Sequence, residues 1–349
     1  MIGPNKREIG SEFHQRIQED GDGLNLSDSV EWIYVFSGRT AIETVLKNIL
    51  QYRTVNKVVL PSYCCESMLQ PFKKANIIIE FYDVYYDDGF KITPFVSDDT
   101  TILIWCNYFG FRFPMADFSA FKENGGIIIE DITHSLLSEQ PYHDQSDYLV
   151  ASIRKWEPVL CGGLCADIKG SFFYYPTKTP PQSFINKKHK AMAMKTEYLI
   201  KHEALMKEKY LALFNSSNEW LSNNYMDLGI DSESRRYIES ADIIRQKNKR
   251  INNARILYQG LRKMSTIKTL FPEEQMDCPL FVPVIIAEGK RDKVRKTLIK
   301  NEIYCPVHWP HPQASCNSNL YNIELSLICD QRYSTIDMYR ILDVLSICE

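Results

Sequence analysis

The stretch from Ile127 to Trp156 constrains the fold most, because it sets reactive side chains directly after two apolar runs. Its first part, Ile127–Ile129, is a short β-branched run typical of a buried strand in a parallel sheet. The run leads straight into Glu130 and Asp131, so we expect a carboxylate at the carboxyl end of a strand, where open α/β sheets bind ligands. The chain is therefore predicted to be an α/β protein with its site at the strand ends.

The same stretch adds three further groups to that site. His134 stands three residues after Asp131, and a second apolar run, Tyr148–Ala151, is followed by Ser152 and then by Lys155. Pyridoxal phosphate requires a lysine for its Schiff base and an acidic partner for its pyridinium nitrogen. A lone lysine is usually a surface residue and a lone aspartate can simply cap a helix, so the prediction of this cofactor depends on the whole set.

Six segments resemble, in the same order, segments of the DegT/StrS-type sugar aminotransferases, a fold-type-I pyridoxal phosphate family. The segments are SGRTA, LPSYCC, CNYFG, EDITHSL, SIRKW and CPVHWP, and the resemblance runs from about Gly10 to the C-terminus. Its most specific part is EDITHSL followed by SIRKW. The resemblance implies an α/β, aminotransferase-like fold of type I, in which a large domain with a mostly parallel sheet precedes a small C-terminal α+β domain.

The resemblance also implies roles for individual residues. Lys155 is similar to the Schiff-base lysine, Asp131 to the partner of the pyridinium nitrogen, and His134 to the residue near the cofactor's phenolic oxygen. Ser152 resembles the serine that binds the cofactor's phosphate. The remaining cofactor-binding positions fall into two groups. The loop similar to the one that binds the phosphate comprises Gly38, Arg39 and Thr40, and the position beside the ring is Cys65.

Two positions depart from the family pattern. Cys65 stands where the family commonly has an aromatic residue that stacks on the cofactor, so that contact is either missing or comes from another residue, with Tyr63 and Tyr108 the nearest candidates. Asn107 stands where many members have histidine. A guanidinium binds carboxylate or phosphate with two hydrogen bonds, so Arg112 is the expected partner of a substrate anion. The full set of expected substrate-binding residues is Tyr63, Asn107, Tyr108, Arg112, His308 and Trp309.

The activity that the resemblance implies is transfer of an amino group from glutamate to a nucleotide-linked keto-sugar, in surface polysaccharide or secondary metabolite biosynthesis. The partners would be a small-molecule amino donor and a keto acceptor. Two alternatives stay open. One is another pyridoxal phosphate reaction on a small amino acid or keto acid, and the other is a non-catalytic homologue that only binds the cofactor. Related scaffolds carry out different chemistries, so the fold alone does not choose among them.

The composition is that of an ordinary soluble globular protein. Of 349 residues, 44% are hydrophobic and 24% are charged, and the net charge of -3 argues against a nucleic-acid partner, which requires a basic excess. The ten cysteines are irregularly spaced, unlike a secreted disulfide framework, and no apolar run approaches a signal or membrane-spanning segment. We therefore expect a cytoplasmic protein without membrane contact and, by the commonest symmetric arrangement, a homodimer.

Strand and helix signals alternate through most of the chain, as in a parallel sheet covered by helices. The predicted division is a polar N-terminal arm over 1–30, a large cofactor-binding domain over 31–235 and a small domain over 236–349. The basic run at 187–190 predicts a solvated helix face. Three further local predictions are a helix over Cys65–Ala75 interrupted near Pro71, a strand over Gly170–Tyr175, and one long helix over Tyr237–Met264.

Two features have both a simple and a functional interpretation. Ser37 precedes a helical pattern, and taken alone it favours a helix cap, although a helix N-terminus also suits a phosphate. A second feature is a set of zinc-ligand residue types, Cys305, His308, His311 and Cys316. Prolines restrict that loop and no paired CxxC exists, so no metal is predicted.

Overall fold

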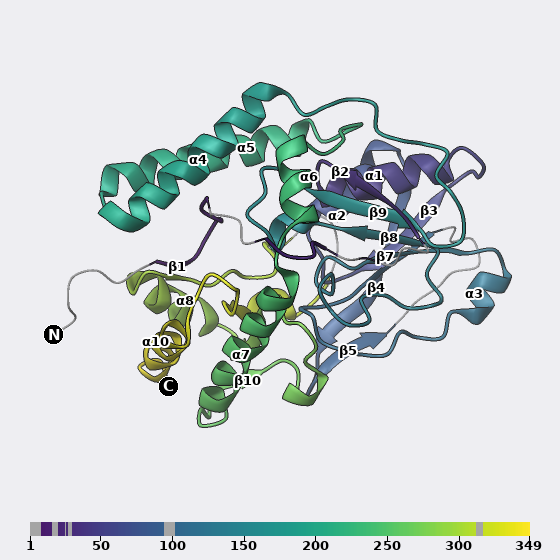
Figure 1. Ribbon diagram of the computed structural model, residues 1–349. Coiled ribbons are helices and arrows are strands. Elements are labelled where there is room, and N and C mark those ends of the chain that lie inside the picture. The colour runs from purple at the N-terminus through teal and green to yellow at the C-terminus, as the bar shows by residue number, and fades with distance from the viewer. Residues whose placement is uncertain (1–7, 16–19, 25, 27–29, 94–101, 312–316) are drawn as a thin grey trace. The chain divides into compact units, whose positions relative to one another are not determined.

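The computed structural model describes residues 8–15, 20–24, 26, 30–93, 102–311 and 317–349. These residues form two compact units (Figure 1). Unit 1 is described within 12–54 and 148–243, and unit 2 comprises 8–11, 55–147 and 244–349, less the residues not described. Each unit thus combines segments that are far apart in sequence. The division into arm, large domain and small domain stays a prediction, and part of the arm lies outside the described residues.

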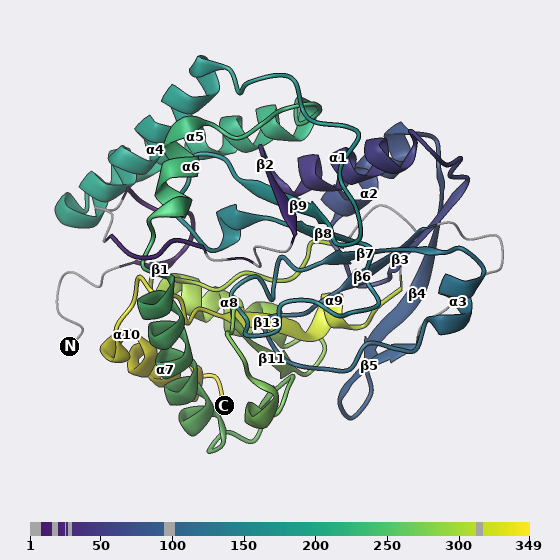
Figure 2. The ribbon, with the colours of Figure 1, turned by 45° about the vertical axis from the view of Figure 1, so that its right-hand side comes forward.

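Unit 1 contains three antiparallel strands that pair in the order β2, β9, β8. These strands are β2 (Glu31–Val35), β9 (Gly163–Asp167) and β8 (Tyr148–Ala151). Its helices are α1 (Gly38–Ile49), the short 3-10 helix η1 (Ile153–Lys155), α4 (Gln182–Lys201), α5 (Ala204–Asn223) and α6 (Ser232–Glu239). The apolar spacing of α1 buries Ala41, Ile42, Val45, Leu46 and Ile49. Helices α4 and α5 lie side by side (Figures 1 and 2).

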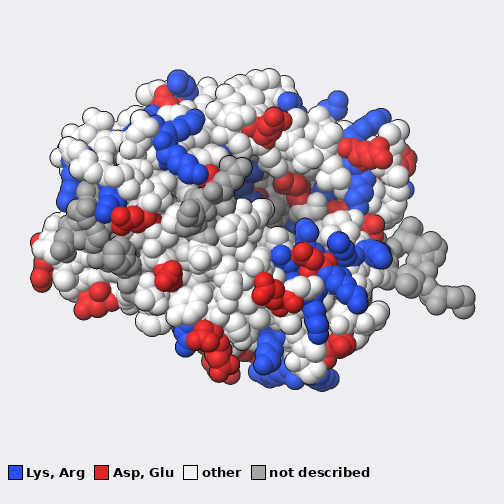
Figure 3. All heavy atoms as spheres, turned by 180° about the vertical axis from the view of Figure 1, so that it is seen from behind, with Lys and Arg blue, Asp and Glu red and all other residues white. Residues whose placement is uncertain are grey.

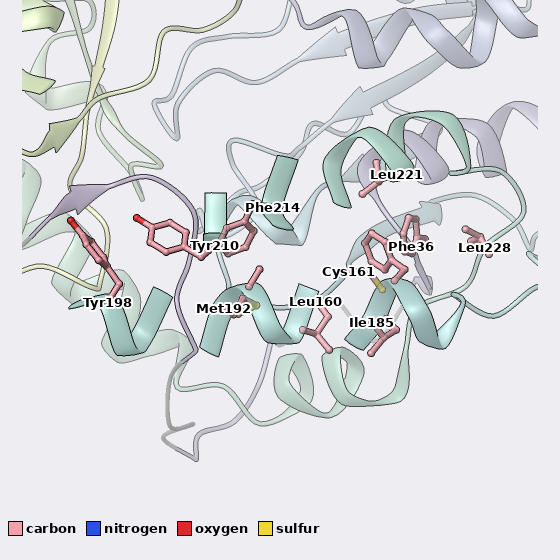
Figure 4. Close-up of a cluster of buried hydrophobic side chains, with 12 residues drawn as sticks. Phe36, Leu160, Cys161, Ile185, Met192, Tyr198, Tyr210, Phe214, Leu221 and Leu228 are labelled. Carbon is pink, nitrogen blue, oxygen red and sulfur yellow. The ribbon is translucent and has the colours of Figure 1, made fainter. Parts of the chain in front are cut away.

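The α4–α5 pair packs around an apolar cluster that includes Phe36, Met192, Tyr210 and Phe214 (Figure 4). The basic run on α4 is not wholly solvated, so that prediction is wrong for Lys188, which is only 4% exposed. Its Nζ lies 4.5 Å from the centre of the Phe214 ring, and burial lowers its pKa to about 8. Its Nζ also lies 3.6 Å from Oε2 of Glu12, so an acidic partner and an aromatic ring together offset the cost of burying this charge, which overrides the composition-based expectation.

Unit 2 contains five strands that pair in the order β7, β6, β3, β4, β5, the first four of them parallel. They are β3 (Lys57–Pro61), β4 (Ile78–Tyr86), β5 (Phe90–Thr93), β6 (Ile102–Cys106) and β7 (Ile127–Asp131). Strands β3 and β6 are neighbours, with β4 on one side and β7 on the other, so the strand order reverses between them. Open sheets bind ligands outside the carboxyl ends at such a reversal.

The rest of unit 2 is an antiparallel sheet with covering helices and a short strand pair. Strands β10 (Ile267–Thr269), β11 (Val282–Ile286) and β13 (Glu324–Leu327) pair in that order, with β11 beside β13 in Figure 2. Strand β1 (Ile9–Gly10) pairs with β12 (Ile303–Tyr304). The helices are α2 (Glu66–Lys74), α3 (Ser119–Glu123), most of α7 (Ile243–Leu261), α8 (Arg291–Lys300), α9 (Leu320–Ile323) and α10 (Thr335–Ser346).

Three local predictions are wrong. Helix α2 continues through Pro71 without interruption. The segment Gly170–Tyr175 is not a strand, and its Phe173 N–H donates to the Asn48 side chain at 2.6 Å instead of to a neighbouring strand. The expected long helix over Tyr237–Met264 is broken, because α6 ends at Glu239 and α7 begins at Ile243. Between these two helices, Ala241 forms an isolated antiparallel β-bridge with Asp20.

Three further observations concern the surface, the cysteines and the helices of the described residues. Acidic and basic side chains of the described residues intermix on the face drawn in Figure 3. Nine described cysteines are free thiols, of which Cys64, Cys161 and Cys165 are buried and Cys65 is partly exposed. Within the described ranges, we find no helix with the length and apolar character needed to span a bilayer.

Candidate active site

Lys155 lies at the end of η1, directly after β8, in unit 1. Its neighbours Ile153 and Trp156 are almost completely buried, and the N–H of Ile153 donates to the backbone oxygen of Gly162 at 3.2 Å. Ser152 and Lys155 themselves are partly exposed. The turn is thus anchored by apolar side chains while it presents a hydroxyl and an amine.

The N-terminus of α1 approaches this turn closely. A Cβ added to Gly38 would lie 2.9 Å from Cβ of Ser152, so only glycine fits there without a shift. The Ser37 hydroxyl accepts a hydrogen bond from Thr40 N at 3.2 Å, which confirms the cap interpretation. A helix N-terminus beside a serine hydroxyl is a combination that suits a phosphate group.

The other two predicted residues of the phosphate loop have local partners. The Arg39 guanidinium donates to the backbone oxygen of Ser222 at 3.0 Å and lies 5.1 Å from the Tyr225 ring. The Thr40 hydroxyl donates to the backbone oxygen of Tyr225 at 2.8 Å. These side chains therefore fix the chain that follows α5 against α1. That they bind a cofactor stays a prediction.

Gly38→Ala tests this cradle. We expect weaker cofactor binding together with a loss of about 1–3 kcal/mol in the free energy of unfolding, because the new methyl group forces α1 and Ser152 apart. Titration of the protein with pyridoxal phosphate measures the effect. Gly229→Ala is the matched control, since its Cβ would meet nothing nearer than 3.7 Å. Equal cofactor affinity in both variants would contradict the cradle.

Glu130 and Asp131 end β7 in unit 2 and have different surroundings. Glu130 is fully buried and accepts hydrogen bonds from Asn107 Nδ2 (2.7 Å), His143 N (2.9 Å) and Ser146 Oγ (2.5 Å). Asp131 is partly exposed, and its Oδ1 accepts from Thr133 N at 2.8 Å. Glu130 is therefore a structural carboxylate, whereas Asp131 presents its charge at the carboxyl end of the strand.

His134 has its tautomer fixed by the backbone. The N–H of Phe109 donates to Nδ1 of His134 at 3.1 Å, so that nitrogen acts as the acceptor. The neutral ring then carries its proton on Nε2. The imidazole is nearly parallel to the Trp309 ring, with centroids 5.6 Å apart, and lies at the same distance from the His308 ring. His134 is thus a buried donor in contact with two other predicted site residues.

Tyr63 and Tyr108 join the same aromatic cluster but are fully buried. The two rings stack with centroids 5.8 Å apart, and the Tyr63 ring lies 5.0 Å from Trp309. The Tyr108 hydroxyl donates to the backbone oxygen of Tyr63 at 2.7 Å. Cys65 precedes α2 and lies 2.8 Å from the Ser67 hydroxyl. In this structure the tyrosines support Trp309 rather than present an open face for stacking.

Asn107 and Arg112 are held by protein partners. The Asn107 amide nitrogen donates to Glu130 and also lies 2.9 Å from Ser135 Oγ. Arg112 donates from Nε to Asp277 at 2.9 Å and from Nη2 to Glu139 at 3.0 Å, and its hydrogen bond with Asp277 raises its pKa. Their predicted substrate roles stay predictions, and for Arg112 they require exchange of one carboxylate for a substrate anion.

The structure also shows a polar network that sequence reasoning missed. Glu324 and Ser326 of β13 contact His308, and Glu324 is fully buried. The alternating pattern Glu324-Leu325-Ser326-Leu327 places both polar residues on one face of a strand and could have revealed them. Within the described residues, no three His, Cys, Asp or Glu side chains are placed to hold a metal ion, and Cys316 lies outside that range.

Comparison with known proteins gives a fold. No family model and no curated protein matches the chain. DesI, crystallised in the presence of its TDP-sugar product, matches with a TM-score of 0.62 at 13% identity, over 91% of this chain and 80% of that chain. The PLP-form of Spr1654 from Streptococcus pneumoniae matches with a TM-score of 0.58 at 13% identity, over 91% and 86%. Helicobacter pylori PseC, an aminotransferase involved in the biosynthesis of pseudoaminic acid, gives the same four values. The chain therefore has the fold of these proteins, which confirms the α/β, aminotransferase-like fold predicted from the sequence.

Proposed function

We propose that this chain is a pyridoxal phosphate-dependent aminotransferase that moves an amino group from glutamate to a keto-sugar linked to a nucleoside diphosphate. The observation that carries the proposal is the close approach of Gly38 to Ser152, three residues before Lys155, in a chain with this fold. A helix N-terminus and a serine hydroxyl beside a partly exposed lysine fit the cofactor that the sequence predicts.

Unit 1 would bind the cofactor's phosphate and its aldehyde carbon. The N-terminus of α1 and the Ser152 hydroxyl would hold the phosphate, and Nζ of Lys155 would hold the cofactor covalently. When bound, pyridoxal phosphate supplies a ring that draws electrons from the substrate carbon. Once the amino donor has freed the Lys155 amine, that amine would take the proton from the substrate carbon and return it to the cofactor's aldehyde carbon.

The residues at and after the end of β7 would act on the ring. The Asp131 carboxylate would hold a proton on the ring nitrogen, because a negative charge beside a pyridinium favours its protonated form. His134 would donate its Nε2 proton to the phenolic oxygen, since its Nδ1 is already an acceptor for Phe109 N. The presence of Asp131, Ser152 and Lys155 together argues against a homologue that has lost catalysis.

The proposed acceptor class is a nucleotide-linked keto-sugar. DesI, which was crystallised with a TDP-sugar product, has this fold, and that supports the choice. Trp309 is partly exposed above a buried aromatic support, so it can stack on a sugar or base. The Arg112–Glu139 pair is exposed, with side-chain exposures of 57% and 75%, so a diphosphate could replace Glu139 at small cost while Asp277 keeps the guanidinium oriented.

Cofactor absorbance in a two-stage mixing experiment tests this proposal. Glutamate should convert the bound cofactor to its amino form, and a keto-sugar nucleotide should restore the original spectrum faster than any free keto acid other than 2-oxoglutarate. If only small keto acids restore it, the alternative chemistry on amino acids replaces the sugar proposal. If no donor changes the spectrum, the chain is a non-catalytic cofactor-binding homologue.

We further propose a cytoplasmic homodimer, without nucleic-acid or membrane partners, acting in surface polysaccharide or secondary metabolite biosynthesis. The nine free thiols among the described cysteines support a reducing compartment. A symmetric dimer is the commonest closed assembly, and sedimentation equilibrium measures it directly. A fully active monomer would contradict the dimer.

A further inference from the structure

Three side chains of unit 2 form a closed ring of polar contacts. Oε2 of Glu324 accepts the backbone N–H of His308 at 2.9 Å, and Oε1 lies 2.5 Å from Oγ of Ser326. The same Oγ lies 2.7 Å from Nδ1 of the His308 ring. Glu324 and Ser326 are fully buried, and His308 is 6% exposed. Ser326 is thus the only link between the buried carboxyl group and the imidazole among these three side chains.

The two short contacts fix the number of protons in this ring of contacts. A serine hydroxyl carries one hydrogen and can donate in only one direction at a time. Distances of 2.5 Å and 2.7 Å are both hydrogen bonds, so one further proton must lie on Glu324 or on Nδ1 of His308. If Glu324 is protonated, it donates to Ser326, which donates to Nδ1. If Glu324 is ionised, Nδ1–H donates to Ser326, which donates to the carboxylate.

The surroundings keep both arrangements accessible near neutral pH. Burial raises the pKa of the Glu324 carboxyl to about 7, against the opposing effects of Ser326, His308, Tyr63 and Arg291. Nη1 of Arg291 donates to the backbone oxygen of Glu324 at 3.1 Å. The titratable or charged groups that face the carboxyl are Tyr63, Arg291, Cys305 and His308, with Tyr321 beyond Tyr63. The rings that surround His308 are those of His134, Trp309, Phe109 and Phe281.

We propose that Glu324, Ser326 and His308 form a proton relay that stores one proton on a buried carboxyl group and delivers it at Nε2 of His308. In the loaded state Glu324 is protonated and Nε2 carries a hydrogen. On delivery the Nε2–H bond breaks, Ser326 gives its proton to Nδ1, and Glu324 gives its proton to Ser326. The three groups together lose one proton and gain one negative charge. Acceptance of a proton at Nε2 reverses each transfer.

The relay makes Glu324 and Ser326 positioning residues for His308. Their use in amino transfer rests on the proposed function and on the expectation that His308 binds the acceptor, where it would supply the proton that the acceptor's carbonyl oxygen needs to leave as water. The relay itself needs neither cofactor nor substrate. The two ideas can therefore fail separately.

Nitrogen-15 NMR of histidine-labelled protein, free of cofactor, tests the relay. The chain has seven histidines, and His308→Asn identifies the His308 signals by their loss. A relay predicts that the proton-bearing nitrogen of His308 changes from Nε2 to Nδ1 as pH rises through about 7, the pKa of Glu324. An isolated histidine would instead lose one proton from a doubly protonated ring. That second behaviour, or a single tautomer at all pH values, would overturn the proposal.

Glu324→Gln provides the decisive variant. Its amide oxygen can accept His308 N and its amide nitrogen can donate to Ser326, so it should lock His308 in the Nε2–H form and abolish the pH-dependent change. Ser326→Ala should abolish the change by removing the link. Ser217→Ala is the matched control, a buried serine in α5 whose hydroxyl donates to the Leu213 backbone oxygen at 2.8 Å. A pH-dependent tautomer change that persists in Glu324→Gln, or is lost in Ser217→Ala, would refute the relay.

Discussion

Replacing Lys155 with alanine should abolish amino transfer while leaving the protein folded. The side chain is partly exposed at the end of η1, and the turn is anchored by the buried residues Ile153 and Trp156, so little packing is lost. Loss of the proton carrier alone costs roughly 10²–10⁴-fold, and loss of the covalent attachment adds to it. Turnover of glutamate with a keto-sugar nucleotide measures the effect, with Lys190→Ala, an exposed lysine of α4, as the control.

Chemical reduction gives an independent check on the same residue. Borohydride should fix the cofactor on one peptide that contains Lys155, and Lys155→Ala should prevent that labelling. A label on a different lysine, or undiminished turnover in the variant, would remove Lys155 from its proposed role. Circular dichroism of both variants verifies that the fold is retained.

Asp131→Asn should lower kcat on the order of 10²–10³-fold, the scale observed when one preorganised electrostatic partner of the reacting system is removed. The asparagine keeps the shape of the side chain and can still accept the hydrogen bond from Thr133 N. Only the negative charge is lost, so cofactor binding should weaken less than the rate falls. Rapid-mixing spectra with glutamate separate the chemical step from binding.

The neighbouring residue supplies the contrast. Glu130→Gln should act on stability, at a cost of about 1–3 kcal/mol in the free energy of unfolding, because it puts amide hydrogens where Glu130 now accepts from three donors and contacts Nδ1 of His143 at 2.8 Å. Urea denaturation measures that loss. A near-normal rate in Asp131→Asn, or a slow but fully stable Glu130→Gln protein, would mean that the two carboxylates have the opposite roles.

The sequence predicted the fold and the strand-end positions because both depend on local signals. The β-branched run before Asp131 and the helical spacing after Ser37 each specify an element without reference to distant residues. The parallel topology then follows from the alternation of strand and helix signals, and parallel strands bring their carboxyl ends to the same edge of the sheet. Lys188 shows where this reasoning stops, because its burial depends on Phe214 of another helix.

Side-chain partners at the site could not be predicted, because most of them are distant in sequence. Arg112 contacts Asp277, and the turn that contains Ser152 meets the N-terminus of α1, across more than one hundred residues in each case. His308 and Ser326 are only 18 residues apart in sequence, but their contact depends on which face of β13 carries Ser326. Residue types therefore identified the candidates, and only the folded structure shows which of them already have partners.

The pairing of β2 with β9 has a consequence for synthesis of the chain. Residue Ile33 of β2 is opposite Cys165 of β9, so the strand that pairs with β2 among the described residues of unit 1 is made about 130 residues later. At roughly 5–20 residues per second, that wait is on the order of ten seconds. During it the strand Glu-Trp-Ile-Tyr-Val is an open edge that other chains can pair with. Slower translation lengthens this exposure.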